Sequence, residues 1–179
     1  MSRIIAGTAR GRHLLVPRGL GTRPTSDKVR GAVMNILGQF FEGGEVLDLY
    51  AGSGALALEA LSRGCGRALC VERDRKALDA LRRNARACGM EGRVELLCAQ
   101  LPEGLARVGR GGFALAFADP PYADGPEGVL ALLGGLLRAG ARVVAEHDAR
   151  RPPADRFGAL GLEDRRAYGG TGISIYRRE

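Results

Sequence analysis

Four consecutive residues, Asp119-Pro120-Pro121-Tyr122, have the types and order needed to bind an amine. Each proline lacks a backbone N–H, so the pair stiffens the chain and presents carbonyl acceptors beside the Asp119 carboxylate. An exocyclic amine of a nucleic-acid base is a donor with a delocalised lone pair, and surrounding acceptors favour the pyramidal form that attacks an electrophile. Tyr122 adds an aromatic face for stacking on the base, worth roughly 1–3 kcal/mol. The motif therefore favours chemistry on a base amine, although a simple turn capped by Asp119 would use the same residue types.

A second group of residues has the spacing of a cofactor-binding turn. Gly52-Ser53-Gly54 follows an apolar run and precedes a helical pattern, and glycine permits a tight turn and close approach of a ligand. Asp48 lies four residues before Gly52, where its carboxylate can orient the loop or face a cation. Glu72 ends the next apolar run, and its carboxylate can accept hydrogen bonds from both hydroxyls of a ribose. Nicotinamide cofactors and S-adenosylmethionine both contain ribose, so these residues do not distinguish one cofactor from the other. Such a turn can also serve packing alone.

These residues fall on a pattern of alternating strands and helices. We expect a Rossmann-like α/β fold: a mostly parallel seven-stranded sheet with helices on both faces and an antiparallel C-terminal edge pair. The predicted strands cover residues 46–50, 68–72, 94–98, 113–118, 141–146, 160–168 and 172–177. The predicted helices run from a cap at Thr25, Ser26 or Asp27 to Leu37, and over residues 55–62, 74–87 and 128–138.

The N-terminal region differs from the rest of the chain in charge. Of the net charge of +7, the first thirty residues contribute seven basic residues against one acidic residue, a net +6. Residues 1–18 are predicted to form a hairpin and residues 19–24 a loop. We therefore divide the chain into a basic arm (1–24), which is not an independent domain, and one domain over residues 25–179. A basic arm suits a polyanionic partner, but a solvated basic terminus would have the same composition.

Composition excludes several other classes of protein. Apolar residues make up 45% of the chain and charged residues 26%, as in a globular domain. No apolar run is long enough to cross a membrane, and the first residues do not resemble a signal peptide, so we expect a cytoplasmic protein. The four cysteines form no C-x-x-C pair, and neither histidine has metal-ligand spacing, which argues against a metal or a disulfide framework.

The two motifs together resemble class I S-adenosylmethionine-dependent methyltransferases that act on base amines. The opening of the chain narrows the resemblance to the bacterial RsmD family, whose members methylate guanine N2 in 16S ribosomal RNA. The matching segments are Arg3-Ile-Ile-Ala-Gly7, Gly11-Arg12, Arg23-Pro-Thr25 and the run from Asp27 to Leu37. The similarity extends from Arg3 to about Tyr122 and is looser beyond that residue.

The resemblance implies roles for individual residues. Asp119, Pro120 and Tyr122 would bind the target guanine. Glu72 would bind the cofactor ribose, and Gln100 stands where such enzymes often have an acidic residue that contacts adenine. The cofactor loop would comprise Asp48, Tyr50, Ala51, Gly52, Ser53 and Gly54, and contacts to RNA would come from Arg3, Arg10, Arg12, Arg23 and Thr25. The implied cofactor is S-adenosylmethionine, with S-adenosylhomocysteine as product and no metal.

Three other functions are compatible with parts of the sequence. An adenine-amine methyltransferase shares the Asp-Pro-Pro-Tyr motif, but 179 residues leave no room for an additional target-recognition domain. A nicotinamide-dependent oxidoreductase would leave that motif unexplained, and a catalytically silent RNA-binding protein would explain only the basic arm. The sequence leaves open which guanine is modified and whether the substrate is naked RNA or an assembling small-subunit particle. It also leaves the oligomeric state open, with a monomer as our expectation.

Overall fold

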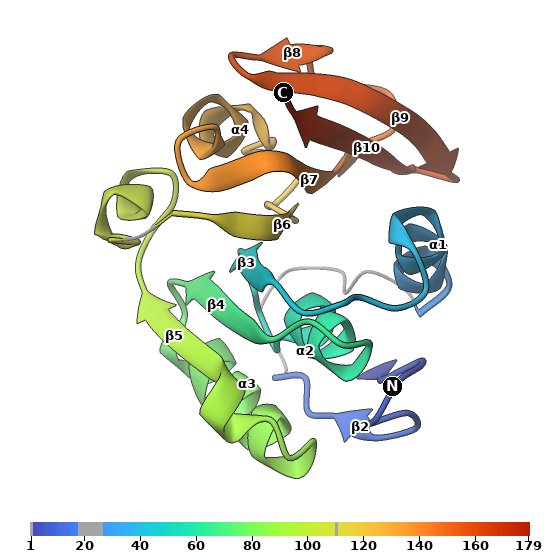
Figure 1. Cartoon of the computed structure of the whole chain (residues 1–179), viewed down its shortest axis with the longest axis vertical. Coiled ribbons are helices and arrows are strands. Elements are labelled where there is room, and N and C mark those ends of the chain that lie inside the picture. Colours follow the sequence, from blue (N-terminus) through green and yellow to red (C-terminus); the bar gives the residue numbers. More distant parts are fainter. Residues whose placement is uncertain (1, 18–26, 110) are drawn as a thin grey trace.

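The computed structural model describes residues 2–17, 27–109 and 111–179. At its centre lies an eight-stranded sheet in the order β5-β4-β3-β6-β7-β10-β9-β8 (Figure 1). Its strands are β3 (Glu45–Leu49), β4 (Arg67–Glu72), β5 (Val94–Cys98), β6 (Phe113–Ala118), β7 (Leu137–Asp148), β8 (Arg156–Phe157), β9 (Leu160–Tyr168) and β10 (Thr171–Arg178). The helices are α1 (Asp27–Leu37), α2 (Ala55–Ser62), α3 (Arg75–Ala87) and α4 (Glu127–Leu133), with short 3-10 helices η1 (Glu91–Arg93) and η2 (Glu103–Arg107).

The first five strands of the sheet are parallel, as predicted. In the register, Leu47 of β3 pairs with Leu69 of β4 on one side and with Ala116 of β6 on the other. Residues on both faces of β3 and β6 are buried, which explains why these strands are near-continuous apolar runs rather than alternating ones. Because the strands are parallel, their carboxyl ends lie at the same end of the sheet. Asp48 is the penultimate residue of β3, Glu72 is the last residue of β4 and Asp119 directly follows β6, so all three lie near this end.

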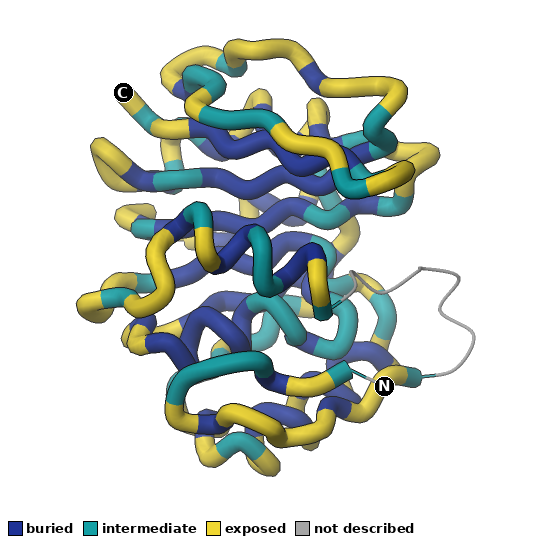
Figure 2. Tube along the Cα trace, turned by 90° about the vertical axis from the view of Figure 1, so that its right-hand side faces the viewer, coloured by how far each residue is buried: buried dark blue, intermediate teal, exposed yellow. Residues whose placement is uncertain are grey.

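Helices cover both faces of the sheet and create two apolar cores. On one face, α1, α2 and α3 pack against side chains such as Val46, Cys70 and Phe117. On the other face, η2 and α4 pack against Leu47, Leu69 and neighbouring strand residues. Figure 2 shows buried residues following the central strands while exposed residues gather at the loops. The two cores confirm the expected layered α/β architecture.

The C-terminal strands are antiparallel, as expected, but they are not a simple edge pair. β10 pairs with both β7 and β9, so it lies inside the sheet. The two-residue strand β8 pairs with β9 and forms the outer edge, which makes the sheet eight-stranded rather than seven-stranded. So short a strand has too few residues to show a period-2 pattern, and it was missed for that reason.

The predicted helix over residues 128–138 is wrong in its second half. Helix α4 ends at Leu133, directly before Gly134 and Gly135, and glycine costs a helix roughly 1 kcal/mol per residue relative to alanine. Leu137 already pairs with Phe113 at the start of β7. Strand β7, the fifth strand predicted from the sequence, therefore begins four residues before the predicted start at Ala141, because pairing to β6 overrides the apolar pattern.

The N-terminal hairpin packs against the end of the molecule formed by α2 and α3 (Figure 1). Its strands β1 (Ser2–Arg3) and β2 (His13–Leu14) form a separate two-stranded antiparallel sheet. The predicted loop over residues 19–24 and the cap candidates Thr25 and Ser26 lie outside the described residues. Among the helices of the described segments, none combines the length and apolar composition required to cross a membrane.

Candidate active site

A cavity of about 720 Å³ opens at the carboxyl ends of the parallel strands. Open α/β sheets bind ligands at this end of their strands, and the volume lies within the usual range of roughly 300–1,000 Å³ for such sites. The cavity brings together most of the residues singled out from the sequence. Its wall includes Asp48, Tyr50, Ala51, Gly52, Ser53, Glu72, Gln100, Asp119, Pro120 and Tyr122.

The loop after β3 has a backbone that only some residues can adopt. Gly52 and Gly54 have positive φ angles of 54° and 82°, and Tyr50 also adopts a positive φ of 61°. A Cβ on Gly54 would lie 2.6 Å from Leu81 Cγ, so this glycine is required by packing against α3. A Cβ on Gly52 would meet nothing closer than the Tyr50 carbonyl oxygen at 4.0 Å. Gly52 therefore leaves open space on the cavity wall, whereas Gly54 makes the close contact between loop and helix.

Asp48 is a buried carboxyl at the base of this loop. Only 1% of the residue is exposed, and its Oδ2 accepts a hydrogen bond from the Ala57 backbone N–H at 3.0 Å. Burial raises the pKa of Asp48 to about 8, with further contributions from the charges of Asp119 and Glu72, while the Ala57 N–H acts in the opposite direction. Without a ligand, Asp48 therefore holds its proton at neutral pH, and a nearby cation would favour its ionised form.

Glu72 connects the glycine loop to the start of α3. Its Oε2 accepts from the Gly52 N–H at 3.0 Å, and its Oε1 accepts from the Asp74 N–H at 2.8 Å. Asp74 in turn caps α3 by accepting from the Ala77 N–H, which confirms the predicted cap. Each carboxylate oxygen of Glu72 has two lone pairs, so both oxygens keep capacity for a ligand hydroxyl.

The Asp-Pro-Pro-Tyr motif forms a rigid corner after β6. The Pro121 carbonyl accepts hydrogen bonds from the N–H groups of Asp124 and Gly125, which closes the turn. Tyr122 is 49% exposed, and its hydroxyl donates to Glu146 Oε1 at 3.3 Å and lies 2.9 Å from Thr171 Oγ1. The phenol has one proton, so the Thr171 hydroxyl must donate to it when Tyr122 donates to Glu146. The ring is thus held at its hydroxyl end by β7 and β10 while about half of the residue stays accessible.

Gln100 lies on the cavity wall two residues after β5. Its side chain is exposed, and its backbone carbonyl accepts from the Gly104 N–H at 2.7 Å. A neutral amide with both donor and acceptor atoms therefore stands at the position where the resemblance would favour an acidic residue.

The basic residues of the hairpin point away from the apolar core. Arg3, Arg10 and Arg12 are all exposed. None of them lines the cavity, although the hairpin itself reaches the cavity wall through Ser2, Val16 and Pro17. Arg23 and Thr25, the remaining expected RNA contacts, lie outside the described residues.

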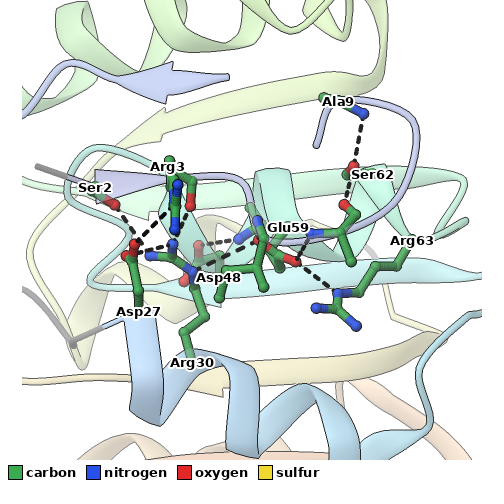
Figure 3. Close-up of polar contacts among 12 residues, drawn as sticks. Ser2, Arg3, Ala9, Asp27, Arg30, Asp48, Glu59, Ser62 and Arg63 are labelled. Atoms are coloured by element: carbon green, nitrogen blue, oxygen red, sulfur yellow. Dashed lines mark hydrogen bonds and ion pairs between the residues drawn. The ribbon is translucent and has the colours of Figure 1, made fainter. Parts of the chain in front are cut away.

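The hairpin is attached to the domain by a buried ionic network (Figure 3). Glu59, in the middle of α2, is completely buried and accepts hydrogen bonds from the backbone N–H groups of Ile5 and Ala6. Its carboxylate also pairs with Arg63 at 2.7 Å and lies 3.8 Å from Arg30 Nε. Arg30 is 1% exposed, lines the cavity, and donates to Ser2 Oγ and to the Arg3 carbonyl. The network therefore holds the start of the hairpin beside the cavity.

Several polar residues that shape this region do not belong to the motifs singled out from the sequence. Glu59 and Asn84 each occupy a buried position on an otherwise apolar helix face, and that break in the pattern was the available signal. Glu146 meets Tyr122 through the pairing of β6 with β7, and Thr171 through the pairing of β7 with β10, neither of which a local pattern reveals. All four cysteines are free thiols, and residues 2–17, 27–109 and 111–179 contain no cluster of three or more metal-ligating side chains.

Comparison with known proteins identifies the family. The family described as "Conserved hypothetical protein 95" matches residues 2–177. YlbH of Bacillus subtilis (strain 168) is 35% identical over 181 residues, which cover 98% of each chain. "Ribosomal RNA small subunit methyltransferase D" of Escherichia coli (strain K12) is 34% identical over 180 residues, covering 99% of this chain and 90% of its own.

Solved structures agree with this similarity. A protein from Thermus thermophilus is 33% identical with a TM-score of 0.80, and 98% of both chains is covered. An RNA methyltransferase from Salinibacter ruber, solved with S-adenosyl-L-homocysteine, shares the fold at 20% identity, with a TM-score of 0.66 over 87% of this chain and 94% of its own. Together with the two motifs on one cavity wall, these matches show that the chain belongs to the RsmD family.

Proposed function

We propose that this protein transfers a methyl group from S-adenosylmethionine to the exocyclic N2 amine of a guanine in 16S ribosomal RNA. One observation supports this most directly: a single cavity has the glycine loop with Asp48 and Glu72 on one part of its wall and Asp119 to Tyr122 on another. A donor and an acceptor bound there would be held side by side, and such positioning can be worth about 7–11 kcal/mol of a reaction barrier.

The residues of the loop fit the proposed cofactor. The cofactor would supply an activated methyl group on a cationic sulfonium. Asp48 would ionise beside its positive charges, because a cation offsets the burial that raises the pKa of this carboxyl to about 8. Glu72 would accept from the ribose hydroxyls while holding the Gly52 N–H, and Gln100 would contact the adenine. The choice of cofactor is supported by the Salinibacter ruber methyltransferase of the same fold, which was solved with S-adenosyl-L-homocysteine.

The acceptors of the Asp-Pro-Pro-Tyr corner would bind the target base. The Asp119 carboxylate and the Pro120 carbonyl would accept hydrogen bonds from the two N–H groups of the guanine amine. These bonds would orient the lone pair of the amine. Tyr122 would stack on the base, with its ring fixed through Glu146 and Thr171. The base must leave its helical stack to reach this cavity, which suits a single-stranded or locally opened RNA.

The hairpin would bind the RNA backbone. Arg3, Arg10 and Arg12 are exposed on the segment that also reaches the cavity wall, so phosphate contacts there would place the target nucleotide near Asp119. Ribosomal RNA as the substrate is supported by the E. coli relative, whose name assigns it to the small subunit. An assembling small-subunit particle is part of the proposal, since one domain with one arm offers little surface for reading a sequence.

Mass spectrometry of methylated nucleosides tests the proposal. Purified protein, S-adenosylmethionine and undermethylated small-subunit RNA, either naked or in particles, should yield N2-methylguanosine at one site. N6-methyladenosine instead would support the adenine-amine alternative. Asp119→Ala should abolish methylation while RNA binding is retained, and activity in that variant would refute the proposed role of the motif. Stabilisation against heat by NAD but not by S-adenosylhomocysteine would refute the choice of cofactor.

A further inference from the structure

Asn84, near the end of α3, connects the N-terminal hairpin directly to the glycine loop. Its Oδ1 accepts from the Leu15 N–H at 2.8 Å, and its Nδ2 donates to the Leu15 carbonyl at 3.0 Å. The same Nδ2 donates to the Ser53 carbonyl at 2.9 Å. Asn84 is 1% exposed, so the amide end of each bond is buried, although Leu15 is 56% exposed. A single buried amide therefore holds two segments that lie far apart in the sequence.

Both segments held by Asn84 belong to the cavity wall. Ser53 lies between Gly52 and Gly54 in the loop, and Val16 and Pro17 directly follow Leu15. Leu15 itself follows β2, the strand next to the exposed Arg12. The loop is where the cofactor would bind, and the hairpin is where RNA would bind. Asn84 thus lies between the two proposed ligands.

Among polar side chains of this size, an amide supplies the hydrogen-bonding groups that this position requires. One acceptor and two donors match one N–H and two carbonyl groups, a combination that a carboxylate cannot reproduce because it has no donor. If the hairpin leaves its place, Asn84 loses both bonds to Leu15, and those bonds no longer fix the orientation of the amide that donates to the Ser53 carbonyl. A ligand that holds the loop in its observed form would therefore favour the docked hairpin.

We propose that Asn84 is a positioning residue that couples cofactor binding to RNA binding. The inference rests on the proposed function, because it assigns the loop to the cofactor and the hairpin to RNA. A coupling of this kind is reciprocal: S-adenosylhomocysteine tightens RNA binding by some factor, and RNA tightens S-adenosylhomocysteine binding by the same factor. Couplings between two sites typically amount to about 5–150-fold, which binding titrations resolve.

The test measures that factor in both directions for the wild type and for Asn84→Asp. Affinity for a small-subunit ribosomal RNA transcript is measured with and without saturating S-adenosylhomocysteine, and the converse titration is made with and without RNA. We expect equal factors of at least about 5 in the wild type and a factor near 1 in the variant. A variant that keeps the wild-type factor, or a wild type with a factor of 1, would overturn the inference.

Ser62→Ala provides the matched control. Ser62 Oγ accepts from the Ala9 N–H and donates to the Ala6 carbonyl, so it holds the same hairpin without touching the glycine loop. This variant should be less stable but keep the coupling factor. If Ser62→Ala removes the factor as fully as Asn84→Asp does, then general loosening of the hairpin, and not Asn84, accounts for the effect.

Hydrogen exchange in the wild type keeps the inference testable even if Asn84→Asp does not fold. S-adenosylhomocysteine should slow exchange of the Leu15 amide, which bonds to Asn84, more than exchange of the Ala9 amide, which bonds to Ser62. Equal protection of both amides would contradict the role of Asn84. Failure of the wild type to bind S-adenosylhomocysteine or RNA at all would instead refute the proposed function, so the two failures are distinguishable.

Discussion

Replacement of Asp48 by asparagine should stabilise the ligand-free protein, and increasingly so as the pH rises. Burial raises the pKa of Asp48 to about 8 in the folded protein, whereas an unfolded aspartate has a pKa near 4. Between these values the folded state holds a proton that the unfolded state has lost. The stability of the wild type therefore falls as the pH rises through this window.

The magnitude follows from the width of the window. A one-proton difference changes the free energy of unfolding by about 1.4 kcal/mol per pH unit, so the wild type should lose about 4 kcal/mol relative to the variant between pH 4.5 and 7.5. Asparagine does not titrate, and its Oδ1 can still accept from the Ala57 N–H that now bonds to Asp48. Above pH 8 the difference should stay constant.

Urea unfolding of both proteins across this pH range measures the difference. The exposed Asp79, which pairs with Arg82, provides a control in Asp79→Asn. That variant removes a solvent-screened ion pair and should change stability by less than about 1 kcal/mol at every pH. If Asp48→Asn shows a difference that does not vary with pH, or destabilises the protein at pH 7.5, the reasoning about the buried carboxyl is refuted.

Three further predictions concern the buried network, the hairpin and the aromatic ring. Glu59→Gln removes the buried counter-charge of Arg63, whereas Arg30 keeps its ion pair with Asp27 at 2.9 Å, so urea unfolding should show a loss of about 3–5 kcal/mol; a loss below about 1 kcal/mol would contradict the network. Arg12→Ala should make the plot of log affinity for ribosomal RNA against log salt concentration shallower by about 0.7–0.9 if one phosphate contact is lost. An unchanged slope would place Arg12 outside the interface. Tyr122→Phe keeps the stacking face and should retain most of kcat/KM, whereas Tyr122→Ala should lower kcat/KM by about 5- to 150-fold; equal losses in both variants would show that the hydroxyl, not the ring, matters.

Proton release on ligand binding offers a separate check on Asp48. The positively charged amino group of S-adenosylhomocysteine would favour the ionised carboxyl, so binding at pH 7 should release up to one proton. Calorimetry in buffers of different ionisation enthalpy measures this release, and Asp48→Asn should not show it. Equal proton release by both proteins would place the source elsewhere.

The sequence by itself determined the parts of this protein that depend on local pattern. Alternating apolar runs and helical stripes predicted the parallel strands and most helices, because burial on a sheet or helix requires those periods. The glycine loop and the Asp-Pro-Pro-Tyr corner were found for a similar reason: their backbone geometry depends on glycine and proline at particular positions. The boundary between α4 and β7 was misplaced because strand pairing to Phe113 decided it.

Only the tertiary structure decided how these parts meet. Leu15 and Asn84 are 69 positions apart, and Tyr122 meets Thr171 across 49 positions, so no local pattern could pair them. The ionisation of Asp48 likewise depends on desolvation and on two other carboxylates, Glu72 at the end of β4 and Asp119 directly after β6. A residue type specifies which hydrogen bonds and charges are available, but the folded chain sets the distances and the burial that determine their effect.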